Sequence, residues 1–193
     1  MTTTTILPNG NKIYPGLVCR SIEFFIDDNG IFQVLSSGNV KEFSKAPYSY
    51  HQILKEAIEQ DPEAAKILHE WHPTSELQRL VQFGKCRFGG LDFKGDVIDF
   101  ELQKGEYVEC AARDTCPAAG ILCHKPVVNG LELSFMEVKV LKALATIETN
   151  EAIAENLNIK LGSFHLLKRN LYEKLKIQTK QEAVMIGRDH NLL

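Results

Sequence analysis

The sequence has no apolar run near the roughly 18 residues that a membrane-spanning helix needs. Its first residues, MTTTTILPNGNK, lack the basic start and apolar stretch of a secretory signal peptide. It also has no Ser-His-Asp order, no glycine-rich phosphate loop after a strand and no H-E-x-x-H pattern. We therefore expect a cytosolic protein with no membrane partner that is not an enzyme.

The charge is unevenly distributed along the chain. The 193 residues are 44% hydrophobic, which suits one or two small globular domains, and the net charge of −3 indicates no partner by itself. Residues 160–180, however, contain six basic side chains and one acidic side chain. Such a local excess is typical of a surface that faces a polyanion.

The first 125 residues combine strand and helix patterns, and we predict an α+β domain over residues 1–125. An Asn29-Gly30 turn between two β-rich runs indicates a hairpin. Asp61 followed by Pro62 indicates the start of a helix. A role as a sensor or interaction domain is the expectation for this part of the chain. The expected strands are 22–26, 31–35, 97–100 and 106–109, and the expected helices are 48–60, 61–71 and 75–83. We also expect a loop at 1–18, turns at the glycines from Gly84 on, and a linker at 124–130.

Four of the five cysteines fall close together in the sequence, at Cys86, Cys110, Cys116 and Cys123. Disulfides are rare in the cytosol. Four soft ligands held by turns suit a structural zinc ion first and an iron–sulfur cluster second, and His124 is a substitute ligand. The usual C-x2-C pattern is absent. Buried structural thiols and a redox-responsive pair therefore stay open as alternatives.

From residue 126 to 193 the pattern becomes helical. Ser134 and Glu137 form the S-x-x-E capping box of a first helix, and Thr179 and Glu182 form that of a last helix. Between them two short helices are joined by a tight turn at residues 158–159. This order predicts an all-α, four-helix domain that contains a helix-turn-helix.

The helix expected at residues 161–175 has a core face and an unusual outer face. At about 100° per residue, one stripe carries Phe164, Leu167, Leu171 and Leu175, while Leu166 and Arg169 point outward beside His165. An exposed arginine and aliphatic group can read guanine and a thymine methyl in the major groove. A solvated basic face with one stray leucine is the alternative.

Residues 133–184 resemble the LuxR/GerE-type helix-turn-helix of bacterial transcription regulators. The segments that carry the resemblance are LSFMEVKVLKALA, TNEAIAENLNI, SFHLLKRNLYEKLKI and QTKQEAV, in this order and without a gap. The resemblance implies a DNA-binding fold in which residues 161–175 form the recognition helix. It implies base-facing positions at His165, Leu166 and Arg169, and phosphate-facing positions at Thr149, Asn150, Lys160, Ser163 and Lys174.

Three positions depart from the family pattern. Ile147 replaces a loop glycine, Lys160 replaces a Ser/Thr cap, which costs about 1 kcal/mol of capping, and Leu167 replaces a histidine. The fold expectation is unaffected, but the family's usual operator becomes an unsafe guide.

The sequence therefore predicts a DNA-binding transcription regulator whose partner is double-stranded DNA. The alternative is a protein-interaction module that keeps the fold without binding DNA. One short recognition helix offers little interface, so we expect a homodimer on DNA. Its predicted seam residues are Val184, Ile186, Leu192 and Leu193, unless these pack on their own domain.

Overall fold

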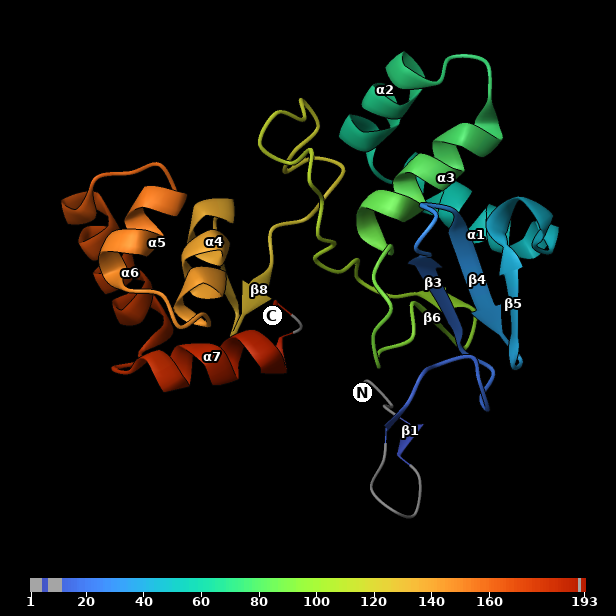
Figure 1. Ribbon diagram of the computed structural model, residues 1–193. Coiled ribbons are helices and arrows are strands. Elements are labelled where there is room, and N and C mark those ends of the chain that lie inside the picture. The colour runs from blue at the N-terminus through green and yellow to red at the C-terminus, as the bar shows by residue number, and fades with distance from the viewer. Residues whose placement is uncertain (1–4, 7–11, 191) are drawn as a thin grey trace. The chain divides into compact units, whose positions relative to one another are not determined.

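The computed structural model describes residues 5–6, 12–190 and 192–193. The chain divides into two compact units, Met1–His124 and Lys125–Leu193 (Figure 1). Within the described residues, no helix is long and apolar enough to cross a membrane.

An antiparallel sheet with the strand order β5-β4-β3-β6-β7 forms the centre of the N-terminal unit. The expected hairpin is present, and its turn is closed by Asp27, whose carboxylate accepts the amides of Asn29 and Ile31 at 2.9 Å. Gly30 takes φ of +75°, which explains the Asn-Gly sequence. The strands are β3 (Ile22–Ile26), β4 (Phe32–Ser36), β5 (Asn39–Glu42), β6 (Val97–Ile98) and β7 (Glu101–Leu102).

Helices follow β5, which is the third strand of this sheet along the chain, and α2 begins where its capping residue predicts. Asp61 caps α2 by accepting the amide of Ala64, with Pro62 as the first helical residue. The same carboxylate also meets Arg87 at 2.5 Å, so the cap ties the start of α2 to the end of α3. The helices are η1 (Phe43–Lys45), α1 (Tyr48–Glu59), α2 (Pro62–Trp71) and α3 (Glu76–Arg87).

The prediction that Gly84 ends the third helix is wrong, because α3 continues to Arg87. A Cβ on Gly84 would lie 2.2 Å from the ring of Phe32. The glycine therefore allows the helix to approach the sheet closely, which is a tertiary contact and not a turn signal.

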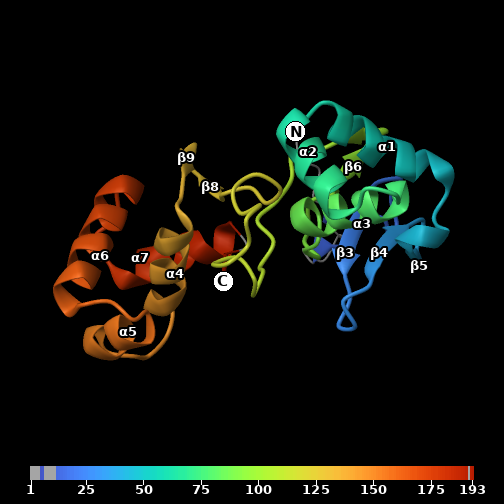
Figure 2. The ribbon, with the colours of Figure 1, turned by 90° about the horizontal axis from the view of Figure 1, so that it is seen from above.

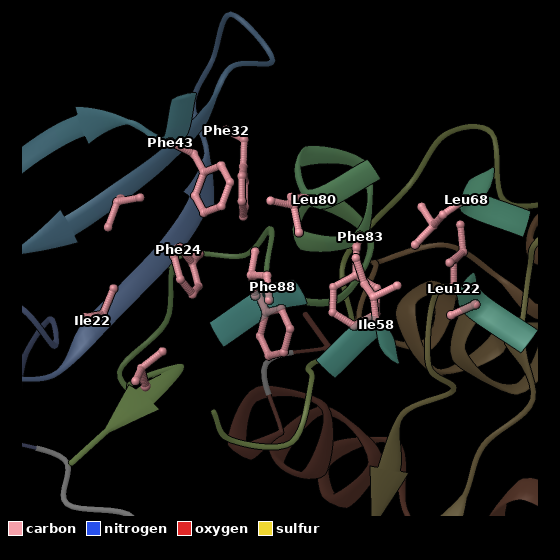
Figure 3. Packing of buried hydrophobic residues seen from close by; sticks show 14 of the residues in the cluster. Ile22, Phe24, Phe32, Phe43, Ile58, Leu68, Leu80, Phe83, Phe88 and Leu122 are labelled. Carbon is pink, nitrogen blue, oxygen red and sulfur yellow. The ribbon is translucent and has the colours of Figure 1, made fainter. Parts of the chain in front are cut away.

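A layer of phenylalanines joins the sheet to the helices (Figure 3). Phe24 and Phe32 are stacked with centroids 5.6 Å apart, and Phe43 lies edge-on to Phe24 at 5.9 Å. Phe88, directly after α3, packs at 6.3 Å from Phe24. Aromatic pairs in these geometries add to the free energy gained by burying apolar surface.

Several short segments of this unit differ from expectation. The strand expected at 97–100 ends at Ile98, because Asp99 and Phe100 take positive φ and turn the chain into β7. Residues 106–109 form no strand. The chain from 103 to 124 is irregular coil up to residue 110 and then mostly turns, with one isolated bridge between Ala119 and Cys123. In the region expected to be a loop, β1 (Thr5–Ile6) pairs with β2 (Lys12–Ile13). The expectation for residues 1–4 and 7–11 lies outside the described residues.

The C-terminal unit is helical except for a small hairpin at its start. The expected linker is partly structured, since β8 (Val127–Val128) pairs with β9 (Leu131–Glu132). The helices that follow are α4 (Phe135–Leu144), α5 (Asn150–Asn156), α6 (Leu161–Leu175) and α7 (Lys180–Asp189). α4 packs against both α6 and α7, and α5 packs against α6 (Figure 2).

Capping boxes fix two helix starts in this unit, as the sequence predicts. Ser134 and Glu137 exchange hydrogen bonds at the start of α4, and Thr179 and Glu182 do so at the start of α7. Apolar side chains with exposures of 5% or less fill the space between the helices. They include Val138, Leu141, Leu144, Ile153, Phe164, Leu171, Leu175 and Ala183.

Candidate DNA-binding surface

α5 and α6 are joined by the tight turn of a helix-turn-helix. Asn158 takes φ of +54° there, a left-handed conformation that asparagine tolerates better than most residues. The amide of Ile159 then donates to the carbonyl of Ala154 at 2.9 Å. The chain is thereby turned into α6, which begins at Leu161.

The start of α6 has the weak cap that the sequence predicts. Lys160 is the capping residue and makes no side-chain hydrogen bond to the first turn. Its ammonium group is free to extend into solvent, since the residue is exposed, as is Ser163 in the first turn. Backbone amides at a helix start favour anions, so this end of α6 suits a phosphate.

α6 presents one face to the core and the other to solvent. Phe164 and Leu171 are fully buried, whereas Leu166 is 50% exposed. His165 and Arg169 are exposed on the same side as Leu166. The structure therefore places the three predicted base-facing residues together on the outer face of the helix, available to a ligand.

A hollow of about 610 Å³ lies beside this outer face. Its charged lining is mainly basic, with Lys168 and Lys176 joining Arg169 against one acid, Glu173. Arg169 and Glu173 are 3.8 Å apart and about 70% exposed, so their ion pair contributes little and leaves the guanidinium available. The complete lining is Asn150, His165, Lys168, Arg169, Tyr172, Glu173, Lys176, Ile177 and Gln178.

The sequence reasoning did not name Lys168, Lys176 or Tyr172 as members of this surface. Lys168 lies over the ring of Tyr172, 5.6 Å from its centroid, which holds the cation near the hollow. Lys176 takes the left-handed conformation that ends α6, with φ of +56°. The available signal was the local excess of basic residues over 160–180, which includes both lysines.

The predicted phosphate contacts near α5 are Thr149 and Asn150. Thr149 caps α5, since its hydroxyl oxygen accepts the amide of Ala152 at 3.3 Å. Its hydroxyl hydrogen can still donate to a phosphate oxygen. Asn150 begins α5 and lines the hollow beside α6.

Lys174, also predicted to face phosphate, has a partner within the protein. Its ammonium group donates to both carboxylate oxygens of Glu137 at 3.0 and 2.9 Å. Partial burial acts to raise the pKa of Glu137, but the hydrogen bonds from Ser134 and Lys174 outweigh it and hold that pKa below its usual value. The pair connects the start of α4 to the end of α6, so Lys174 has a structural role whether or not it contacts DNA.

The departures from the family pattern are accommodated without strain. Ile147 is fully exposed and does not take a positive φ, so the loop between α4 and α5 does not need a glycine at this position. Leu167 is half-buried on α6 and does not belong to the outer face.

The predicted seam residues are in two different environments. Leu192 is 2% exposed, and its amide donates to the carbonyl of Gly187 at 2.8 Å. Leu193 lies against Gly187, where an added Cβ would meet it at 2.5 Å. The chain end thus folds back on α7, while Val184 and Ile186 are half-buried on that helix.

The four clustered cysteines are spread over the end of α3 and the coil after β7. Cys86 and Cys116 are half-buried, Cys110 is exposed and Cys123 is buried. Over the described part of the chain, no three His, Cys, Asp or Glu side chains are placed so that they could hold a metal ion. Cys19 accepts a hydrogen bond from the amide of Gly16.

A tight turn between two helices, the second of which exposes a basic and apolar face, defines a helix-turn-helix domain. Comparison with known families agrees: residues 131–186 match the GerE model, described as bacterial regulatory proteins of the luxR family. The C-terminal unit therefore contains a LuxR-type helix-turn-helix domain, and the resemblance predicted from the sequence is confirmed. No match to the chain was found among curated proteins or among solved structures.

Proposed function

We propose that the protein is a transcription regulator that binds double-stranded DNA sequence-specifically, with α6 in the major groove. The observation that carries the proposal is the outer face of α6, where His165, Leu166 and Arg169 are exposed together above a basic hollow. A helix whose exposed face mixes arginine with an aliphatic side chain has the chemistry needed to read base edges.

Each of the three side chains has a distinct role in this proposal. Arg169 reads a guanine through its two parallel donors, since its pairing with Glu173 is too weak to hold it. Leu166 contacts a thymine methyl, because it is apolar and half-exposed. His165 contacts a neighbouring base edge.

The surrounding polar residues position the helix on the DNA backbone. Lys160 and Ser163 hold a phosphate at the start of α6, where the Lys160 side chain makes no capping hydrogen bond. Thr149 and Asn150 hold a second phosphate at the start of α5. Lys174 is the weakest of the proposed contacts because Glu137 already occupies its ammonium group.

The test is duplex binding by the full-length chain across a range of salt concentrations. The logarithm of the association constant should fall linearly with the logarithm of salt, because each neutralised phosphate releases counterions. Selection from a random duplex pool should enrich one sequence, and Arg169→Ala should lose that preference. Arg20→Ala removes another exposed arginine, from the N-terminal unit, and is the matched control. If no duplex binds at low salt, the unit is a protein-interaction module instead.

We also propose that two copies bind together on DNA. One helix such as α6 buries too little surface for tight binding at physiological salt, and two half-sites supply the remainder. The pairing surface is on α7, where Met185 is 63% exposed beside the half-buried Val184 and Ile186. Leu192 is buried and does not contribute directly. Light scattering with saturating selected duplex should give the mass of two chains per duplex, and Met185→Asp should reduce it to one.

In this proposal the N-terminal unit supplies the regulatory input, as a sensor or as an interaction domain. The α+β unit has its own apolar core, which is the property required of a separate domain.

A further inference from the structure

The chain from residue 103 to 124 is fixed in place without regular secondary structure. It has turns and the Ala119–Cys123 bridge, yet it buries Val108, Ala118 and Leu122. Fixing the backbone costs about 1–2 kcal/mol of conformational entropy per residue. Few backbone hydrogen bonds and a small apolar content leave much of this cost to other interactions.

Arg87 brings the two ends of the cysteine series together. It follows Cys86 in the chain, and its guanidinium donates to the carbonyls of Ile121 and Leu122 at 3.0 Å. Leu122 in turn directly precedes Cys123. The end of α3 that carries Cys86 is therefore joined through one buried arginine to the end of the coil that carries Cys123.

Arg113 connects two of the cysteines in the same way. Its guanidinium donates to the sulfur of Cys123 at 3.3 Å, and the side chain is only 6% exposed. Its backbone amide donates to the carbonyl of Cys110 at 3.2 Å, closing a turn. One residue thus contacts both Cys110 and Cys123.

Cys116, the fourth cysteine, is joined to Cys86 through the apolar core. It packs against the same core cluster as Cys86, and this cluster contains Leu122 from the coil (Figure 3). The amide of Ala119 donates to the carbonyl of Cys116 at 3.1 Å, and Ala119 bridges to Cys123. A chain of hydrogen bonds and one bridge thus links the segments that carry all four cysteines to the end of α3.

We propose that Cys86, Cys110, Cys116 and Cys123 bind a metal centre through four thiolates. The centre is structural, because four protein sulfurs leave no open position for a substrate. It goes beyond DNA binding, since all of its ligands belong to the N-terminal unit. Its effect is to tie the coil to α3, so that metal binding supplies free energy for folding this segment.

The described side chains do not form a finished site for one ion, so binding must draw the sulfurs together. Cys110 is exposed and has the greatest freedom to move. Each thiol that binds releases its proton to solvent, and the cation removes the repulsion among the resulting thiolates.

Two centres share this ligand chemistry. A single zinc ion has Zn–S bonds of about 2.3 Å, so it requires the four sulfurs to close tightly around it. An iron–sulfur cluster binds four cysteine thiolates spread around a larger body, which asks for less movement. The hydrogen bonds from Gln82 to Cys86 and from Arg113 to Cys123 would stabilise sulfur ligands in either centre.

The experiment measures zinc, iron and sulfide in the full-length chain purified without oxygen and without chelator. About one zinc per chain supports the zinc form, whereas iron and sulfide in equal amounts with visible absorption support the cluster. A protein that stays free of both metals, even after incubation with Zn²⁺ or with ferrous iron and sulfide, overturns the proposal.

Variants then test which residues bind the metal. Cys116→Ser and Cys123→Ser should each lose most of the metal, and Cys19→Ser, outside the group, should retain it. Full metal content in either of the first two variants overturns the assignment of ligands. Thiol labelling of the wild type guards against misfolding as the cause. The exposed Cys110 should be protected until a chelator or oxidant removes the metal, and immediate labelling of metal-loaded protein at Cys110 contradicts its role.

Discussion

The acidic residue at the centre of the sheet makes the stability of the N-terminal unit depend on pH. Glu23 is 1% exposed, and alternation along β3 places it on the sheet face opposite to Phe24 and the aromatic core. One carboxylate oxygen accepts the amide of Asp92 at 3.0 Å, while the other is buried without a hydrogen-bond partner. Burial first, and the nearby Asp92 and Glu106 next, raise the pKa of Glu23 to about 9.

The sign of the effect follows from the raised pKa. Between the usual carboxyl pKa of 4.5 and the folded value of about 9, the folded chain keeps a proton on Glu23 that the unfolded chain loses. The stabilisation is therefore complete below the unfolded pKa and decreases as pH rises through this window. One proton corresponds to about 1.4 kcal/mol per pH unit, or about 4 kcal/mol between pH 5 and pH 8.

Glu23→Gln should remove this contribution. Glutamine keeps the acceptor for the Asp92 amide and cannot ionise. As pH rises, the free energy of unfolding of the variant should therefore fall by about 1.4 kcal/mol per pH unit less than that of the wild type. Burial also raises the pKa of Asp96, whose carboxylate accepts the amide of Phe24 at 2.7 Å, and raises that of Glu106 to about 7. These two groups leave the variant some pH dependence of its own.

The assay is urea unfolding at several pH values, followed by the fluorescence of Trp71. This is the single tryptophan of the chain, and it ends α2, so its signal reports the N-terminal unit alone. Glu70→Gln changes an exposed glutamate on the same helix and is the control, with the pH slope of the wild type expected. Equal slopes for the wild type and Glu23→Gln between pH 5 and pH 8 would show that Glu23 is already ionised in the folded protein.

Three further predictions concern single substitutions. Arg169→Ala should cost about 1–3 kcal/mol at one base position and relax specificity there, measured against a panel of single-base duplex variants. Lys174→Ala should lower the salt slope by at most about one, because Glu137 already neutralises its ammonium group. Loss of this pair should destabilise the C-terminal unit by up to about 1 kcal/mol in thermal unfolding. Gly84→Ala should destabilise the N-terminal unit by about 1–3 kcal/mol in urea, because its Cβ would lie 2.2 Å from the Phe32 ring.

Local signals were sufficient to predict most helix starts. The capping box at Ser134 and the Asp61-Pro62 start depend on residues within one turn of each other, and the structure contains both. The hairpin at Asn29-Gly30 is equally local. Such features can be read from the sequence because the interacting groups are neighbours in the chain.

Contacts between distant residues could not be predicted in the same way. The end of α3 was missed because the approach of Phe32 to Gly84 joins positions far apart in sequence. The pairing of Lys174 with Glu137, 37 residues away, was also missed, so the resemblance alone assigned Lys174 to phosphate. Neither contact leaves a periodic pattern in the sequence.

The cysteine spacing predicted a possible metal site but not the three-dimensional arrangement of the cysteines. Their number suggested a metal site, but the spacing does not say whether Cys86 comes near the other three. In the structure, hydrogen bonds from Arg87 and Arg113 connect the segments that carry the cysteines. These arginines are two of the few buried charged residues described. Arginine is usually exposed, so no sequence rule singled these two out. A buried guanidinium must satisfy its donors, and these two do so on carbonyls and on a sulfur of the cysteine-bearing coil. The arginines therefore join the cysteine-bearing coil to α3, and the proposed metal would still have to draw the four sulfurs together.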